Sequence, residues 1–232
     1  MTGRVVVVTG AGRGLGAALV AEAVRLGDIA IAVVRDPEHA DMLSGRERVR
    51  PVLADVTDFD SLDRLEAALR SVPRVDVLVN NAVIVRPAPT LAETSVADLA
   101  ACLAVSGTGA LAVTRLCADG LSRAEQPSIL NVSSRLSTMS APPTALLPGT
   151  ISYTYRMAKA ALNMLTCCLH EEFGSRRFQV LAVHPGALTT RLAPPDADTT
   201  PETAAARVLG LTSRRDLVGV LVDAATGQVL PW

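Results

Sequence analysis

The sequence has 232 residues, of which 49% are hydrophobic and 19% are charged, and its formal net charge is −1. This length fits a single α/β domain, residues 1–232, with a large buried core. The near-zero net charge gives no electrostatic footprint for nucleic acid or for an anionic membrane surface. Charges interrupt the apolar runs well short of the roughly 20 residues that span a bilayer, so we expect no membrane segment.

The four cysteines, Cys102, Cys117, Cys167 and Cys168, occur in segments with a helical pattern and lack metal-ligand spacing. Neighbouring helix positions point to different faces, so the two adjacent cysteines do not form a shared site. We therefore expect buried, reduced thiols and no metal. A strand-like run begins as early as Arg4, which leaves no room for a signal peptide. These features predict a soluble, cytoplasmic protein.

The chain opens on a strand, a glycine-rich turn and a helix. Residues 5–8 are all valine, as in a strand buried on both faces, and an amphipathic run follows the turn. This arrangement points backbone N–H groups and the positive end of a helix at a phosphate. Glycine lets the backbone approach a pyrophosphate closely. We predict a nucleotide site in the turn formed by Gly10, Arg13, Gly14, Leu15 and Gly16.

Apolar strand-like runs alternate with helical patterns along the rest of the chain. Further strands are expected at 28–34, 49–54, 75–79, 128–132, 179–183 and 217–222, and helices at 59–70, within 95–123, at 152–173 and from 200. This alternation predicts a Rossmann-type α/β fold, a doubly wound parallel sheet of about seven strands with helices on both faces. We expect residues 227–232 to form a tail.

The second strand ends next to Arg35 and Asp36. In a dinucleotide fold the residue after this strand meets the adenine ribose, where a carboxylate accepts from the 2′-hydroxyl and an arginine accommodates a 2′-phosphate. Arg35 comes first, and Arg13 in the glycine turn can converge on the same place. We therefore predict NADP(H) as the cofactor, while the adjacent Asp36 keeps NAD(H) as the less favoured alternative.

Tyr155 and Lys159 stand four residues apart in the helix expected at 152–173. One helical turn places them on the same face. A tyrosine titrates near pH 10, and a neighbouring ammonium, joined by an oxidised nicotinamide, favours the phenolate and lowers that pKa. The spacing predicts a general acid, Tyr155, tuned by Lys159. Tyr153 lacks such a partner, because Met157 stands four residues after it.

These motifs together resemble those of the short-chain dehydrogenase/reductase family. Residues 9–16 follow the family pattern Thr-Gly-x-x-x-Gly-x-Gly, and residues 155–159 fit its Tyr-x-x-x-Lys. The runs at 155–164 and 227–232 further resemble the subgroup of C-factor and sniffer-type carbonyl reductases. The resemblance covers nearly the whole chain and implies one NAD(P)-binding Rossmann domain.

The resemblance implies further cofactor contacts. In this family an Asp-Val pair meets the adenine, an Asn-Asn-Ala-Gly run lies beside the nicotinamide half, and a Pro-Gly-x-x-x-Thr run meets the carboxamide. The positions that match here are Asp55, Val56, Asn81, Ala82, Pro185, Gly186, Leu188 and Thr190. Tyr155 and Lys159 belong to the same cofactor site.

The family also implies a serine that holds the substrate oxygen by a hydrogen bond, and here Ser133 and Ser134 are the candidates. Neighbouring strand residues face opposite ways, so only one of them reaches the site, and we assign this role to Ser134. The family places the serine about thirteen residues before the tyrosine, whereas Ser134 lies 21 residues before Tyr155. We expect the extra length to be looped out in a mobile segment, 135–151, that covers the site.

Two positions depart from the family pattern. Val83 replaces the glycine of Asn-Asn-Ala-Gly, and we expect it to crowd the backbone, because a β-branched residue does not follow glycine into positive φ. Ser106 stands where the family usually keeps a structural and catalytic asparagine that anchors a water. A serine hydroxyl reaches through one more water, so we count Ser106 as catalytic and expect a slowed proton relay.

The resemblance implies an NADPH-dependent oxidoreductase that reduces a ketone or aldehyde, or runs the reverse alcohol oxidation, with Tyr155 as general acid. Two alternatives stay open: a non-redox catalyst (isomerase, dehydratase or cyclase) on the same fold, or a cofactor-binding signalling protein. Val83 and Ser106 motivate the first alternative. The resemblance also implies a homodimer or homotetramer, because relatives pair the helix near 105–121 with the tyrosine helix in a dimer seam.

Overall fold

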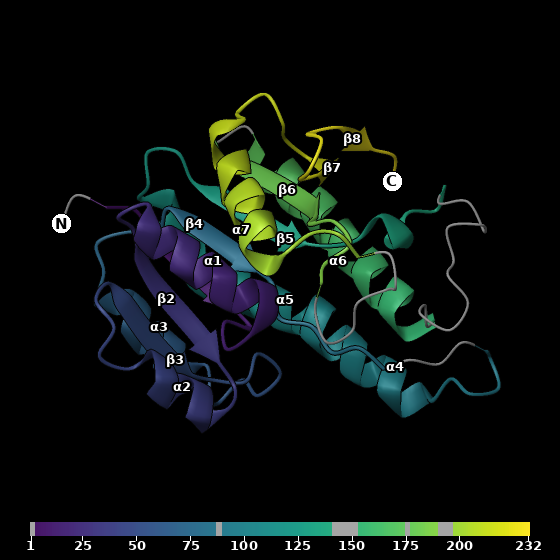
Figure 1. The fold of residues 1–232 in the computed structure, drawn as a ribbon, viewed down its shortest axis with the longest axis horizontal. Coiled ribbons are helices and arrows are strands. Elements are labelled where there is room, and N and C mark those ends of the chain that lie inside the picture. The colour runs from purple at the N-terminus through teal and green to yellow at the C-terminus, as the bar shows by residue number, and fades with distance from the viewer. Residues whose placement is uncertain (1–2, 87–89, 141–152, 175–176, 190–196) are drawn as a thin grey trace.

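The computed structural model describes residues 3–86, 90–140, 153–174, 177–189 and 197–232. Its centre is an eight-stranded sheet with the order β3-β2-β1-β4-β5-β6-β7-β8 (Figure 1). The strands are β1 (Val5–Thr9), β2 (Ile29–Val34), β3 (Val49–Leu53), β4 (Val77–Asn80), β5 (Ser128–Val132), β6 (Gln179–His184), β7 (Val220–Asp223) and β8 (Val229–Leu230). Strands β1 to β7 pair in parallel. The predicted Rossmann-type fold is confirmed.

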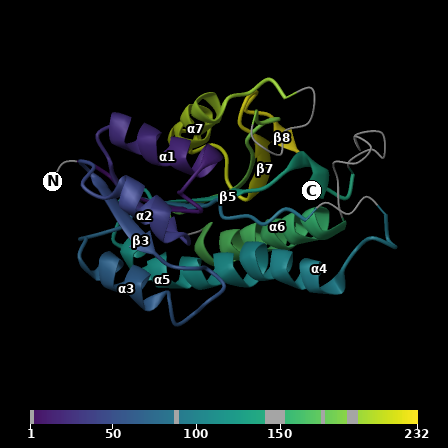
Figure 2. The ribbon, with the colours of Figure 1, turned by 60° about the horizontal axis from the view of Figure 1, so that its bottom comes forward.

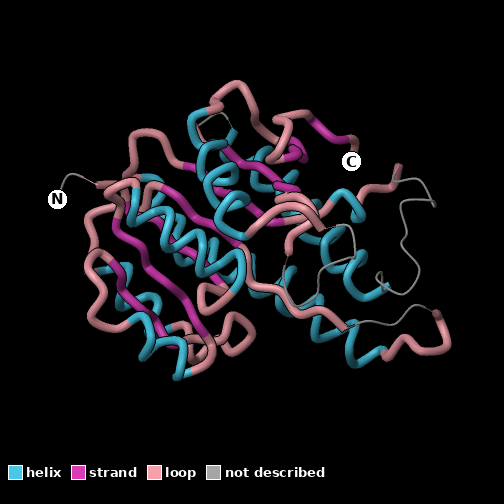
Figure 3. Tube along the Cα trace, viewed as in Figure 1, coloured by secondary structure: helices cyan, strands magenta, loops and turns pink. Residues whose placement is uncertain are grey.

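The strand order reverses between β1 and β4. The chain builds outward from β1 through β2 to β3, then returns to place β4 on the other side of β1. The connections on the two sides of this point leave in opposite directions, which opens a crevice at the carboxyl ends of β1 and β4. The long connections after β4, β5 and β6 extend from this same edge (Figure 3). The fold therefore selects this edge as the place for a ligand.

Strand β8 corrects the prediction of about seven strands followed by a tail. It pairs antiparallel with β7, with Leu230 opposite Leu221. Asp223 Oδ1 accepts from the backbone N–H groups of Ala225 and Thr226, and this turn reverses the chain. A strand of two residues is too short to show an alternating pattern, so β8 has no periodic signal in the sequence.

Helices cover both faces of the sheet (Figure 2). They are α1 (Gly14–Arg25), α2 (Pro37–Leu43), α3 (Asp63–Arg70), α4 (Val96–Leu103), α5 (Ala110–Ser122), α6 (Tyr153–Phe173) and α7 (Pro201–Gly210). Helices α1 and α7 pack together on one face, and α3, α5 and α6 lie on the other. Helix α2 was missed, because it is only seven residues long, buries only Leu43 fully and shows no apolar stripe.

Each central strand is buried on both faces. In β1, Val6 and Val8 belong to the core beneath α1 and α7, while Val5 and Val7 belong to the core beneath α3, α5 and α6. All residues of β1 are buried. Burial on both faces explains why residues 5–8 show no apolar–polar alternation.

Helices α4 and α5 are joined without a break by a π-helical turn, Ala104–Gly109. The expected "one or two helices" within 95–123 is thus one continuous helical stretch. An 18-residue window within Val96–Ser122 has a mean hydropathy of 1.8, so by length and composition alone the stretch could cross a membrane. The expectation that no segment meets this test was too strong. In the fold the stretch packs against α3, α6 and β4, and 33% of that window is buried.

The cysteines are free thiols, and two of the four are buried as expected. Cys102 in α4 and Cys117 in α5 lie in the interior, and burial raises the pKa of Cys117 to about 12. Cys167 is half-buried and Cys168 is exposed, which corrects the expectation of four buried thiols. The two neighbours differ because successive residues of α6 point to different sides of the helix. Among the described residues no cluster could hold a metal ion.

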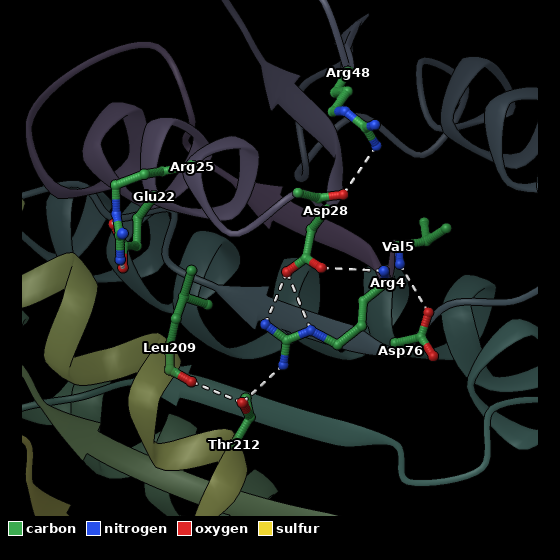
Figure 4. A network of polar contacts seen from close by, with 10 residues as sticks. Arg4, Val5, Glu22, Arg25, Asp28, Arg48, Asp76, Leu209 and Thr212 are labelled. Atoms are coloured by element: carbon green, nitrogen blue, oxygen red, sulfur yellow. Dashed lines mark hydrogen bonds and ion pairs between the residues drawn. The ribbon is translucent and has the colours of Figure 1, made fainter. Parts of the chain in front are cut away.

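A polar network holds the edge of the sheet opposite to the crevice (Figure 4). The guanidinium of Arg4 donates through Nε and Nη2 to Asp28 Oδ2 at 3.1 and 2.8 Å, and the Arg4 backbone N–H donates to Asp28 Oδ1. Arg4 Nη1 also donates to Thr212 Oγ1 at 2.9 Å, and Thr212 donates to Leu209 O. One arginine therefore joins the start of β1 to the start of β2 and to the end of α7.

We predict that Asp28→Ala lowers the free energy of unfolding by about 2–3 kcal/mol, because the variant leaves the fork of Arg4 and a backbone N–H without their acceptor. Thermal unfolding should shift down by roughly 4–10 °C. Arg25→Ala is the control, since it breaks the surface pair with Glu22 drawn in the same figure and should change nothing measurable. Equal midpoints for the two variants would contradict the role given to Asp28.

Candidate active site

The glycine turn and the end of β4 touch backbone to backbone at the crevice. A Cβ on Gly10, whose φ is +65°, would lie 2.8 Å from the Cα of Ala82, and a Cβ on Gly16 would lie 2.0 Å from Gly10 O. No side chain fits in either place. Arg13 is the N-cap residue of α1, its side chain makes no capping hydrogen bond, and the first turn carries no acidic residue. The positive end of α1 is therefore left for an anionic group.

Thr9 and Asn81 tie the ends of β1 and β4 together. Thr9 Oγ1 accepts from the backbone N–H groups of Asn81 and Ala82, both at 3.0 Å. Asn81 Nδ2 donates to Thr9 O at 2.9 Å and to Gly10 O at 3.3 Å. These four bonds fix the backbone of the glycine turn relative to β4. Asn81 and Ala82 thus lie beside the turn, where the resemblance places the cofactor.

The residues after β2 form a small charged cluster beside the turn. Arg35 and Asp36 are exposed; Arg35 Nε lies 3.6 Å from Asp36 Oδ1, and His39 Nδ1 lies 3.4 Å from Asp36 Oδ2. The His39 ring packs against Gly12, because a Cβ there would come within 2.5 Å of the imidazole. Arg13, in the same turn, is exposed. His39 was not among the predicted site residues; it lies four residues past Arg35 in the unpredicted helix α2.

Asp55 and Val56 follow β3 at the same edge. Asp55 is half-buried, and its Oδ1 accepts from the backbone N–H and the hydroxyl of Thr57 at 2.9 and 2.7 Å. Val56 is buried, and its carbonyl approaches the start of α5 so closely that a Cβ on Gly109 would lie 2.9 Å from it. The structure therefore brings this pair to the crevice edge and packs it against the helix that follows the π turn.

The residues after β6 complete the same edge. Pro185 is buried, Gly186 has a φ of +99°, and Leu188 forms an isolated bridge with Thr199. Thr190 lies outside the described residues, as do 141–152, which include most of the predicted covering loop. The first part of that loop forms a short 3₁₀ helix over Arg135–Ser137.

Tyr155 and Ser134 meet at the carboxyl end of β5. The side chain of Ser134 hydrogen-bonds Tyr155, and Ser134 Oγ also accepts from the backbone N–H of Leu136 at 3.2 Å. Ser133 points elsewhere: its hydroxyl donates to Asn163 Oδ1 of α6 at 2.5 Å. The two serines face opposite ways, as strand geometry requires. This geometry favours the assignment of Ser134 over Ser133.

Lys159 lies one turn after Tyr155 and is 2% exposed. Its Nζ donates to Val132 O, the last carbonyl of β5, at 2.6 Å, and lies 5.9 Å from the centroid of the Tyr155 ring. Burial lowers the pKa of Lys159 to about 8. It is also the only lysine in the sequence, where the other 21 basic residues are arginines. That count was a signal of its special role that the sequence analysis did not use.

The pKa of Tyr155 in the protein without cofactor is raised. Burial raises it, and the hydrogen bond with Ser134 opposes that rise in part. The Lys159 ammonium is directed at Val132 O and is not among the groups that lower it. Loss of hydration therefore outweighs the hydrogen bond with Ser134. In this state Tyr155 is a neutral phenol, the form that donates a proton. The expected lowering, which includes an oxidised nicotinamide, stays a prediction for the protein with cofactor bound.

The two departures from the family pattern behave differently. Val83 is 46% exposed and is not among the described residues with positive φ, in line with the expectation that it does not follow glycine there. The expected crowding at the nicotinamide stays a prediction. The chain after Ala82 takes a path open to any residue. Ser106 is 2% exposed within the π turn, which packs against α6. The structure thus places Ser106 in the interior beside the helix that carries Tyr155 and Lys159.

We predict that Lys159→Met stabilises the cofactor-free protein at pH 7. The pKa of this lysine is about 8 when folded and ordinarily 10.5, so between these values the unfolded chain binds more protons and stability rises with pH. Below pH 8 the full cost of burying the charge is present. Methionine should remove it and, after the lost bond to Val132, raise the free energy of unfolding by about 1–2 kcal/mol.

The single lysine also permits a direct measurement of this pKa. Protein labelled with ¹³C-lysine gives one ε-carbon resonance, and its titration midpoint should lie near pH 8. A midpoint near 10.5 would contradict the cost assigned to burial. Arg156→Met is the control, because Arg156 lies three residues before Lys159 on α6. This variant should still show the rise of stability between pH 8 and 10.5.

Comparison with known proteins agrees with this geometry. The family model described as short chain dehydrogenase matches residues 4–200. Human L-xylulose reductase is 34% identical over 195 residues, which cover 83% of this chain and 75% of that protein. The C-signal of Myxococcus xanthus is 32% identical over 123 residues, which cover 53% of this chain and 71% of that protein.

Among solved structures, the NADPH-bound carbonyl reductase from chicken fatty liver superposes with a TM-score of 0.87. The match covers 100% of both chains at 24% identity, so it shows that the fold is shared. The family model matches most of the chain, and 83% of the chain aligns with a reductase at 34% identity. The chain belongs to the short-chain dehydrogenase/reductase family of oxidoreductases and resembles its carbonyl reductase and C-factor members.

Proposed function

We propose that residues 1–232 form one NADPH-dependent reductase domain that converts a ketone or aldehyde to an alcohol, or runs the reverse oxidation. The observation that carries this proposal is the pairing of Ser134 with Tyr155, one turn from a buried lysine, at the same sheet edge as the glycine turn. A hydroxyl pair of this kind suits a carbonyl oxygen, since each hydroxyl can donate its one proton to that oxygen when the substrate replaces the bond between them. The substrate is a small carbonyl or alcohol compound.

In the proposed reaction the nicotinamide, when bound, supplies the hydride that adds to the carbonyl carbon. Ser134 and Tyr155 hold the carbonyl oxygen by hydrogen bonds, and the Tyr155 phenol gives its proton to that oxygen as negative charge develops there. Lys159 sits close enough to Tyr155 to stabilise the phenolate that remains, once cofactor and substrate have displaced water from the site. The raised pKa of Tyr155 before binding keeps the proton in place until then.

The residues around the crevice fit a dinucleotide. The uncapped end of α1 and the close glycine backbone suit a pyrophosphate, and Asn81 and Ala82 lie beside them. Arg13 and Arg35 are exposed beside the turn and would meet a 2′-phosphate, and Asp36 lies 3.6 Å from Arg35 and 3.4 Å from His39. An aspartate held by two neighbours is less available to a ribose hydroxyl, which supports NADP(H) over NAD(H). Asp55 and Val56 would hold the adenine end of the dinucleotide, and the segment from Pro185 would hold its nicotinamide end.

A signalling role is the second candidate, because a relative of 32% identity is a protein named C-signal. A non-redox activity on the same fold is the third, motivated by Ser106. A panel of aldehydes and ketones, incubated with the protein and NADPH, separates these proposals. Loss of absorbance by NADPH supports the reductase. Conversion of a compound without NADPH consumption supports the non-redox catalyst, and tight NADPH binding without any conversion supports the signalling protein.

We further propose that the protein works in the cytoplasm as a homodimer or homotetramer. Two of its thiols are buried and free, as expected in a reducing compartment. Leu111 of α5 and Met157 and Met164 of α6 are large apolar side chains left 44–62% exposed on the outer helices. A second copy that pairs these helices would cover them.

The cofactor proposal predicts that Arg35→Ala weakens NADP(H) binding and leaves NAD(H) binding nearly unchanged. A charge-assisted contact to a phosphate is worth about 1.5–3 kcal/mol, which corresponds to roughly a 10- to 150-fold change in Kd. Fluorescence titration of both cofactors measures this. Arg46→Ala, an exposed arginine beyond α2, is the matched control. Equal affinity of the native protein for both cofactors would overturn the NADP(H) preference.

The mechanism predicts that Tyr155→Phe lowers turnover by at least about 100-fold, because general acid catalysis contributes that much or more. The Kd for NADPH should stay near the native value. Tyr153→Phe makes the same chemical change at an exposed tyrosine two residues away and should keep full activity. If both variants retained turnover, the proton would come from another group and Tyr155 would lose its assigned role.

A further inference from the structure

A chain of buried amide and hydroxyl groups crosses the face of the sheet beneath α5 and α6. Asn80 Nδ2 donates to Thr114 Oγ1 at 3.1 Å and to Asn131 Oδ1 at 2.9 Å. Asn131 Nδ2 in turn donates to Thr166 Oγ1 at 2.9 Å. Asn80 and Asn131 face each other on the neighbouring strands β4 and β5. All four side chains are buried.

The direction of every bond in this chain is fixed by its two ends. Thr114 donates its hydroxyl proton to Ala110 O at 2.7 Å, and Thr166 donates its own to Leu162 O at 2.9 Å. A hydroxyl has one proton, so each threonine oxygen is left to accept. Both amides must therefore turn their NH₂ groups toward these threonines, and Asn80 spends its donors on Thr114 and Asn131.

One hydrogen-bond acceptor in this chain of amides and hydroxyls has no donor. Asn80 Oδ1 is buried and has no hydrogen-bond partner among the residues that the structure describes. Turning the amide over would not help, because it would aim the oxygen at two other acceptors. A buried carbonyl without a donor is costly, and in native proteins such groups are usually satisfied by an ordered water.

The surroundings of this oxygen can hold such a water. A cavity of about 10 Å³ is lined by Asn80, Ser106 and Thr9 together with apolar side chains such as Val105 and Leu162. That volume is about what one water molecule needs. Thr9 Oγ1 already donates to Val79 O and accepts from two backbone N–H groups, so Asn80 Oδ1 and Ser106 Oγ are the two partners for the water. The side-chain hydroxyl of Ser106 makes no hydrogen bond within the described part of the chain, and Ser106 lines the cavity, so the hydroxyl is available to it.

We propose that one ordered water bridges Asn80 Oδ1 and Ser106 Oγ, and that Asn80 is thereby a positioning residue for the π turn. The water donates to the amide oxygen and accepts from, or donates to, the serine hydroxyl. It joins β4, whose next residues line the cofactor edge, to the π turn that packs against α6. A π turn relaxes the regular helix, so it needs such an outside tie to hold one geometry.

The water site stands by itself, whereas its effect on catalysis rests on the proposed reductase activity. The proposal also gives a reason for Ser106. A short hydroxyl plus one water occupies the space between the π turn and Asn80, where a longer amide would reach directly. Asn80 Oδ1 can therefore be satisfied either by a water or by a longer side chain in place of Ser106. Substitutions of Ser106 test the proposal for this reason.

Two tests need no enzymatic activity. A crystal structure of the native protein should show a water within hydrogen-bond distance of Asn80 Oδ1 and Ser106 Oγ. Ser106→Thr and Ser106→Val are equal in size and differ only in the hydroxyl, so the valine variant should unfold roughly 2–6 °C below the threonine variant. Ser106→Asn should displace the water and unfold at or above the native midpoint. Equal midpoints for Thr and Val, or a direct bond between Ser106 and Asn80, overturns the proposal.

Catalysis provides the readout that a merely structural role would not move. With a carbonyl substrate in hand, Ser106→Val should lower kcat several-fold with an unchanged Kd for NADPH, and Ser106→Asn should restore kcat. Thr108→Val is the matched control, because its hydroxyl bonds Ala104 O on the exposed side of the same turn. It should leave kcat unchanged. If no carbonyl is reduced, the proposed function fails while the water site is still decided by the crystal structure and the unfolding midpoints.

Discussion

The contact between β1 and β4 is the constraint on which the site depends. A parallel sheet that grows outward in both directions from β1 must part its connections there, and the gap exposes backbone at two strand ends. The bonds between Thr9 and the Asn81–Ala82 backbone close that gap with side chains in place of a strand ladder. The glycine turn can then approach β4 so closely that only glycine fits, which leaves α1 aimed into the crevice.

The same edge is also where the fold accepts unfavourable burial. The Arg4–Asp28 network at the opposite edge pairs its charges well. The buried amides of Asn80 and Asn131 are also paired, apart from Asn80 Oδ1. At the crevice, Lys159 is buried against a single backbone carbonyl, and Tyr155 keeps its proton because burial raises its pKa. Such buried groups lower the stability of the fold while the site lacks its ligands. Ligands that bind the folded protein and offer polar partners to these groups raise the stability again. The cost at this edge comes from buried polar groups, and Val83 is not among the described residues with positive φ.

Much of this arrangement could be predicted from the sequence, for reasons that differ between elements. Long buried strands and the glycine turn have strong local signals, so their positions were correct to within a few residues. Helix α2 and strand β8 are short and mostly exposed, so they lack periodicity and were missed. The roles of Ser133 and Asn80 could not be found at all, because they follow from partners 30 and 51 residues away. Hydrogen-bond accounting becomes possible only once such partners are placed.

The count of basic residues shows what local pattern reading overlooks. The sequence uses arginine 21 times and lysine once, and that lysine is the residue buried in the site. At the surface lysine and arginine are both tolerated, so the general preference of this chain for arginine decides which of the two stands there. In the interior they differ, because arginine stays charged whereas the compact ammonium of lysine changes its pKa with its surroundings. Lys159 has such a changed pKa, about 8, and three donors that can turn from Val132 to a ligand. An arginine would have neither property, which is why this one position departs from the habit of the whole chain.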